Sequence, residues 1–185
     1  MVNKVKTVIA SVLKPVDDTR MYEKIGHSLQ QTNRYDVNII GFRTKFIPQK
    51  KDIRFFPVFN FHRGSLKRLL VSFPFFYFLL KIRPQLIVVT TFELLPAAIF
   101  YKKLNKNSRL IYDVQENYAL NLLSNRRSDL LAKIGARLVR FIETKAQSHI
   151  HLNFLAEYAY AKEISLIKKR LFLLNKLSND FIRKP

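Results

Sequence analysis

The stretch QLIVVTTFELLPAAIF, residues 85–100, carries the pattern that decides the fold. Its run Gln85–Thr90 is short and apolar at nearly every position, and a helical pattern over Leu94–Leu104 follows directly. Such a run is typical of a strand covered on both faces. Because strand and helix patterns alternate in the same way along the chain, the sequence predicts a three-layer α/β/α domain with a mainly parallel sheet.

Working outward from this unit, the remaining elements follow from the same two periodicities. The other predicted strands are Val5–Leu13, Asp36–Gly41, Arg54–Phe59, Arg109–Asp113, Ile150–Leu155 and Arg170–Leu174. The other predicted helices are Asp18–Thr32, Ser65–Ile82, Asp129–Ser148 and Glu157–Lys168. In the helix Asp129–Ser148 we expect one buried apolar stripe and a separate basic face. The expected stripe is Leu131, Ile134, Leu138, Phe141 and Ile142, and the basic face is Lys133, Arg137 and Arg140.

Length and composition indicate one well-cored domain. The chain has 185 residues, of which 48% are hydrophobic, and two full domains would not fit in this length. The absence of cysteine excludes disulfides, thiolate metal ligation and a cysteine nucleophile, and it fits a reducing cytosol. The apolar start of the chain carries no small-residue cleavage site, so we interpret it as the first buried strand rather than a signal peptide.

The charge is strongly basic, with a formal net value of +20. A field of this size attracts polyanions, and both nucleic acid and anionic lipid qualify as partners. The most apolar segment, Leu69–Leu80, is much shorter than the roughly 20 residues that span a bilayer. It is predicted either to be a core helix kinked at Pro74 or to lie at a membrane surface. The flanking cations that would meet anionic headgroups are Lys67, Arg68, Lys81 and Arg83.

The position of the acidic residues is the most informative feature for function. Six of the 13 acids follow the ends of predicted strands: Asp17, Asp18, Glu93, Asp113, Glu116 and Glu157. Ligands of open α/β sheets bind outside the carboxyl ends of the strands, so these side chains are expected to border one cleft. Each of these acids has a simpler alternative role as a helix cap or first-turn residue, and Asp18, like Asp129 outside this set, is a candidate cap.

Several other chemistries are not indicated. The first strand-to-helix turn, KPVDDTR, contains no glycine, which argues against dinucleotide binding there. Neither a phosphate-binding G-x-x-x-x-G-K-[ST] loop nor a G-x-S-x-G nucleophile motif is present, and the four histidines have no metal-ligand spacing. We therefore expect no metal in this domain.

Four motifs together resemble family 4 glycosyltransferases, in particular bacterial members of surface or capsular polysaccharide synthesis. They are VLKPVDDTRMYEKIG, LIVVTTFELLPAA, LIYDVQENYALNLL and FLAEYAYAKEI, and the resemblance runs from about Lys4 to Asn175. It implies a GT-B architecture, in which two Rossmann-like domains face a cleft. Residues 1–175 would form the N-terminal acceptor-binding domain and 176–185 the start of the interdomain linker. The C-terminal donor-binding domain is then expected to be missing.

The resemblance also implies roles for individual residues. The loop Asp17, Asp18, Thr19 and Arg20 stands where the family has a glycine-rich loop near donor phosphate and acceptor. The segment YDVQENY resembles the family's D-x-H-E pattern, with Gln115 in place of the histidine. Because Gln115 cannot act as a base, Asp113 or Glu116 would orient or deprotonate the acceptor hydroxyl. Further expected acceptor contacts are Glu93, Asn117, Tyr118 and Glu157.

The expected function is metal-independent transfer of a sugar, with retention, from a nucleotide-sugar donor to a glycan or lipid-linked acceptor. The membrane contacts would come from Lys67, Arg68, Lys133, Arg137 and Arg140, at the cytoplasmic face of the cell membrane. One alternative is a non-catalytic subunit that recruits a split transferase to the membrane. The other is a nucleic-acid-binding module, which we rank lower because the aromatic residues lie mostly inside apolar runs.

Overall fold

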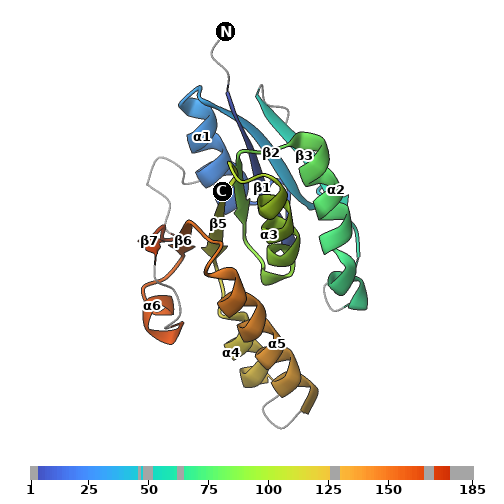
Figure 1. The fold of residues 1–185 in the computed structure, drawn as a ribbon, viewed down its shortest axis with the longest axis vertical. Helices are drawn as coiled ribbons and strands as arrows, with labels where there is room; N and C mark the ends of the chain where they lie inside the picture. The colour runs from blue at the N-terminus through green and yellow to red at the C-terminus, as the bar shows by residue number, and fades with distance from the viewer. Residues whose placement is uncertain are drawn as a thin grey trace.

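The described part of the chain forms a single sheet of seven parallel strands covered by helices on both faces (Figure 1). A computed structural model describes residues 4–45, 47, 52–61, 65–125, 130–164 and 169–175. The strands are β1 (Val5–Pro15), β2 (Tyr35–Phe42), β3 (Ile53–Phe59), β4 (Leu86–Val89), β5 (Arg109–Val114), β6 (Leu152–Leu155) and β7 (Arg170–Phe172). Their order across the sheet is β3-β2-β1-β4-β5-β6-β7. The predicted Rossmann-like α/β/α class is confirmed.

The centre of the sheet is built on β1, which pairs with both β2 and β4. Six consecutive residues of β1, Thr7 to Val12, are buried, as expected of a strand covered on both faces. The edge strand β3 includes Pro57, which a sheet tolerates at an edge because proline has no N–H to donate. All seven predicted strands are present, and since they are parallel their carboxyl ends lie at one edge of the sheet.

Alternate residues of β1 face two separate cores. Val8, Ala10 and Val12 pack on the face covered by α2 (Ser72–Ile82), α3 (Leu95–Leu104) and α5 (Leu130–Ala146). Ile9 packs on the opposite face beneath the π-helix η1 (Thr19–Gly26), which continues as α1 (His27–Gln31). Figure 1 shows α1 on one side of the sheet and α2 with α3 on the other.

The helices differ from the predicted ones in three places. The pattern over Ser65–Ile82 forms a 3-10 turn, η2 (Leu66–Leu70), and then α2, so Pro74 lies in the first turn of a helix and does not kink its middle. A helix missed by the sequence analysis, α4 (Tyr118–Asn125), precedes α5. The pattern over Glu157–Lys168 contains only the short α6 (Tyr160–Glu163) among its described residues, because 165–168 lie outside them. A further 3-10 turn, η3 (Phe92–Leu94), precedes α3. Asp129, the predicted start of the next helix, also lies outside the described residues.

The predicted buried stripe of α5 is wrong. Leu131, Ile134, Leu138 and Phe141 are all exposed, and Ile142 is half-buried. The side of α5 that packs on the domain is made instead of small residues and one acid: Ala132, Ala136, Val139, Glu143 and Ala146. Small side chains let the helix approach α4 closely, as at Gly135, where an added Cβ would lie 3.5 Å from Leu122. The larger apolar residues therefore face outward.

Candidate functional site at the carboxyl edge of the sheet

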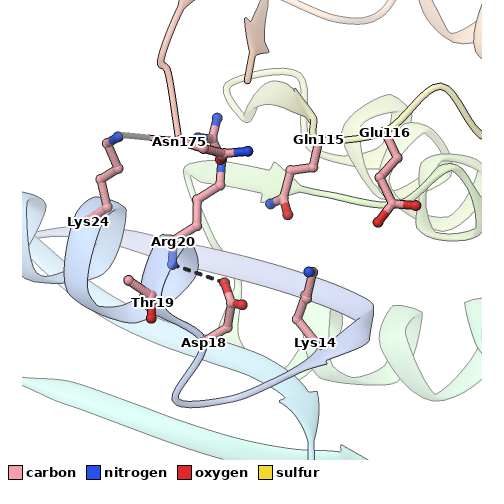
Figure 2. Close-up of a pocket in the computed structure, with 8 residues that line it drawn as sticks. All are labelled: Lys14, Asp18, Thr19, Arg20, Lys24, Gln115, Glu116 and Asn175. Carbon is pink, nitrogen blue, oxygen red and sulfur yellow. Dashed lines mark hydrogen bonds between the residues drawn. The ribbon is translucent and has the colours of Figure 1, made fainter. Parts of the chain in front are cut away.

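A pocket of about 260 Å³ lies at the carboxyl ends of β1 and β5 (Figure 2). One wall comes from the end of β1 and the start of η1, and the other from the segment that follows β5. Its lining residues are Lys14, Asp18, Thr19, Arg20, Lys24, Gln115, Glu116 and Asn175. Figure 2 shows Gln115 and Glu116 pointing across the pocket toward Lys14 at the end of β1 and Asp18 in the loop that follows. Residues nearly 100 positions apart in the sequence thus share one site.

The floor of the site is a buried ion pair between Arg20 and Asp113. The Nε of Arg20 donates to Oδ2 of Asp113 at 2.8 Å, and Nη2 donates to Oδ1 at 2.6 Å. Arg20 is 7% exposed and Asp113 is fully buried. Such a two-point contact fixes the orientation of both groups, because the planar guanidinium matches the carboxylate. Asp113 therefore has no surface with which to touch an acceptor in this conformation.

Two amide side chains extend this ion pair into the pocket. Gln115 Nε2 donates to Oδ2 of Asp113 at 2.8 Å, and Arg20 Nη1 donates to Oδ1 of Asn175 at 2.9 Å. Lys24 donates to the backbone carbonyl of Leu174. Burial lowers the pKa of Lys24, and the neighbouring charge of Arg20 lowers it further. The segment that leaves β7 is thereby attached to η1.

The two acids of the loop before η1 have mainly structural roles. Oδ1 of Asp18 accepts from the backbone N–H groups of Arg20 and Met21 at 3.0 and 3.1 Å. This confirms Asp18 as a helix cap. Oδ2 of Asp17 accepts from the hydroxyl of Thr44 at 2.8 Å. These bonds hold the loop in place without glycine, and the second oxygen of Asp18 remains beside the pocket.

After β5, the residues predicted as a group have different environments. Glu116 is half-buried and lines the pocket, where it accepts from Asn121 in a long contact of 3.4 Å. Asn117 accepts from the N–H of Leu120 at the start of α4 and donates to Glu163. Tyr118 is buried and donates to the carbonyl of Thr90 at 3.1 Å. Burial raises the pKa of Tyr118 well above its usual value. Glu116 is thus the group placed to meet a ligand.

Glu93 and Glu157 follow the ends of β4 and β6 but do not line this pocket. Glu93 is 8% exposed, and its Oε1 pairs with Arg68. Its other oxygen, Oε2, has no hydrogen-bond partner among the described residues. Glu157 is exposed and adjoins Tyr160, whose hydroxyl donates to the carbonyl of Gln115 at 3.0 Å. Burial raises the pKa of Tyr160, and the charges of Glu157 and Glu116 raise it further.

The five predicted membrane-contact residues fall into two groups. Lys133, Arg137 and Arg140 are exposed on α5, whereas Lys67 and Arg68 lie in η2. Lys67 is exposed, but Arg68 is half-buried and paired with Glu93. Within the described part of the chain, no helix is long and apolar enough to cross a bilayer. No cluster of three or more metal-ligating side chains occurs among the described residues either.

Sequence reasoning missed three residues of the pocket: Lys14, Lys24 and Asn175. The first strand was expected to end at Leu13, but it continues to Pro15 and carries Lys14 to the edge of the sheet. Lys24 is one turn after Arg20 on η1, a spacing that could have indicated a shared face. No local signal identifies Asn175, because it reaches the site only through the addition of β7 to the sheet.

The site and its sheet define a class of fold that is shared with solved structures. The chain is similar to sucrose-phosphate synthase from Thermosynechococcus elongatus, with a TM-score of 0.65 and 10% identity over 92% of this chain and 48% of that protein. It is also similar to a putative UDP-N-acetylglucosamine 2-epimerase from Listeria monocytogenes, with a TM-score of 0.51 and 11% identity over 88% of this chain and 41% of that one. The chain spans about half the length of each, and the likeness supports the GT-B fold.

Comparison with models of known protein families gives no match. Comparison with curated protein sequences gives none either. At 10% and 11% identity the structural likeness concerns the fold alone. The function has to be argued from the site.

Proposed function

We propose that this chain is the acceptor-binding half of a glycosyltransferase that moves a sugar from a nucleotide sugar to a glycan acceptor in surface polysaccharide synthesis. The observation that carries the proposal is the polar pocket at the carboxyl ends of β1 and β5, where parallel α/β sheets bind their ligands. The GT-B fold and the four motifs that resemble family 4 glycosyltransferases support it. The nucleotide-sugar site then belongs to a second domain that faces this pocket.

Within the proposal, Glu116 orients or deprotonates the acceptor hydroxyl. Asp113 was the other candidate for this role, but both of its oxygens accept hydrogen bonds from Arg20. Glu116 is partly exposed and lines the pocket, and among the described residues its carboxylate accepts one long hydrogen bond, from Asn121. A carboxylate with unused acceptor capacity can bind a sugar hydroxyl at hydrogen-bond distance. Arg20 and Asp113 position the wall on which Gln115 and Glu116 lie.

The remaining polar side chains suit a hydroxylated ligand. Gln115 uses its Nε2 on Asp113, which leaves its Oε1 as an acceptor. Lys14 and Thr19 add donors on the opposite wall. The acceptor in this proposal is lipid-linked, the enzyme lies at the cytoplasmic face of the membrane, and transfer proceeds without a metal and with retention. These features come from the resemblance to family 4.

Binding of the chain to an array of oligosaccharides tests the proposal. We expect at least one glycan to bind the wild-type chain and to bind the double variant Gln115→Ala/Glu116→Gln about tenfold or more weakly, because two groups that pair with the sugar are altered. The control is Asp52→Asn, which changes an exposed acid just before β3, at the amino edge of the sheet. A chain that binds no glycan, or binds one equally well in both variants, would contradict the proposal.

A further inference from the structure

The outer surface of α5 presents large apolar side chains to solvent. Leu130 is 69% exposed, Ile134 52%, Leu138 48% and Phe141 59%. At helical spacing these four residues lie on one side of the helix, opposite the small residues that pack on the domain. A helix of an ordinary globular domain has the reverse arrangement, with its large apolar residues buried. We call this surface the outer face of α5.

Cations border this apolar surface, and no exposed carboxylate of α5 does. Lys133, Arg137 and Arg140 are exposed on the flank of the outer face, and Lys145 lies 5.8 Å from the centre of the Phe141 ring. The acid of α5, Glu143, is turned into the domain, where it accepts from the hydroxyl of Tyr112 at 2.7 Å. Residues 117–156 contain six lysines and arginines but only two acids.

The position of α5 relative to the pocket is favourable for a ligand held at a surface. The helix α4 begins at Tyr118, two residues after Glu116 of the pocket, and packs against α5. Figure 1 shows α4 and α5 extending together beyond the end of the sheet. On the same side of the sheet, α2 exposes Phe73 and Tyr77. A flat surface in contact with α5 would therefore lie near the carboxyl edge.

We propose that the outer face of α5 docks on an anionic lipid bilayer, with its apolar side chains among the headgroups and its flanking cations on lipid phosphates. An apolar strip bordered by Lys and Arg is the arrangement of helices that lie in a membrane interface. A protein partner would need acidic groups around its own apolar patch, whereas an anionic bilayer supplies both features everywhere on its surface. This inference rests on the proposed function for its purpose, and the binding itself is independent of sugar transfer.

The first experiment is co-sedimentation with two kinds of vesicle. One is made of phosphatidylcholine alone and the other of phosphatidylcholine and phosphatidylglycerol in equal amounts. We expect the chain to bind the second kind, and the triple variant Lys133→Glu/Arg137→Glu/Arg140→Glu to bind it about a hundredfold more weakly, given the attraction of each cation to an anionic surface. The matched control is Lys6→Glu/Lys106→Glu/Arg109→Glu, which makes the same charge change near the amino edge of the sheet and should bind almost normally.

A fluorescence experiment reports the docking surface directly. The chain contains no tryptophan, so a single introduced tryptophan is the only one in the protein. We expect the emission of Leu138→Trp to shift to shorter wavelength when anionic vesicles are added, because the indole enters the interface. The emission of Leu171→Trp, at an exposed position on β7, should not shift. Both are exposed positions, so the substitutions leave the core intact.

Four outcomes would overturn the proposal. They are equal failure to bind either vesicle, equal weakening by the two triple variants, no shift for Leu138→Trp, and dimerisation of the chain that Leu138→Ser abolishes. The last result would assign the outer face of α5 to a second copy of the chain. The variant Glu116→Gln should still bind vesicles, so failure of the sugar-transfer proposal and failure of the docking proposal can be told apart.

Discussion

Removing one partner of the Arg20–Asp113 pair tests whether this pair organises the pocket. Arg20 is 7% exposed, and Asp113 is fully buried with hydrogen bonds to both of its oxygens. The single variants Arg20→Met and Asp113→Leu each leave one charge buried without its partner. We expect each to lower the free energy of unfolding by about 3–5 kcal/mol, a large share of the roughly 5–15 kcal/mol that a domain possesses.

The double variant Arg20→Met/Asp113→Leu should be less destabilised than either single variant, because no unpaired charge remains and both replacements are apolar. Gln115 and Asn175 lose partners in this variant, but both lie in the pocket, where water can reach them. The assay is urea denaturation followed by circular dichroism, and Arg20→Lys serves as a milder single variant that keeps the charge but loses the paired geometry. The reasoning would be refuted if the double variant lost as much unfolding free energy as the two single variants together, within about 0.5 kcal/mol.

Three further predictions concern the stability of the fold. Burial raises the pKa of Glu143 above its ordinary 4.5, against the opposing hydrogen bond from Tyr112, so the folded chain retains a proton that the unfolded chain has released. The free energy of unfolding should therefore fall as pH rises from 4.5 through the raised pKa. Glu143→Gln should remove this fall, which denaturation curves measured across that pH range would detect. A variant whose unfolding free energy falls with pH as steeply as that of the wild type would contradict the prediction. Gly41→Ala places a Cβ 2.8 Å from the backbone oxygen of Lys14 and should cost about 1–3 kcal/mol in thermal unfolding; a neutral result would show that the end of β1 yields easily. Asp18→Ala removes the acceptor of two backbone N–H groups and should cost about 1 kcal/mol, whereas Asp18→Asn should be nearly neutral, and equal losses would argue against a capping role.

The strand β4 was predictable because it is a short run with an apolar residue at every position. The pattern of Gln85–Thr90 has no helical alternative of sufficient length, and β4 (Leu86–Val89) lies within it. The parallel arrangement followed from the alternation with helices, and it places the carboxyl ends of different strands at one edge of the sheet. Of those six acids, Asp18 and Glu116 line the pocket, and Asp113 lies beneath it.

The faces of the helices were less predictable, and α5 shows why. Periodicity identifies which residues share a side of a helix but not which side meets the domain. The rule that large apolar side chains face inward selected Leu131, Ile134, Leu138 and Phe141, and the structure buries Ala132, Ala136 and Val139 instead. For the same reason α4 was missed, since its apolar residues divide between the domain and solvent: Ala119 is buried and Leu120 is exposed.

The pairing of Arg20 and Asp113 was also beyond the sequence. Asp113 was chosen because it follows a strand, and Arg20 because its loop resembles the first loop of family 4; both side chains are nearly inaccessible because they pair with each other. A buried opposite charge 93 residues away leaves no mark in the local pattern. The same holds for Glu93 of η3, which pairs with Arg68 of η2, 25 residues earlier in the chain.

The guanidinium of Arg20 has a consequence for biosynthesis. It joins positions that are 93 and 155 residues away along the chain, and the second of these follows the last strand of the sheet. A nascent polypeptide leaves the ribosome from its amino end, so the residues of η1 emerge long before Asn175 does. The part of the cavity wall that Asn175 supplies can therefore be completed only after translation has passed β7.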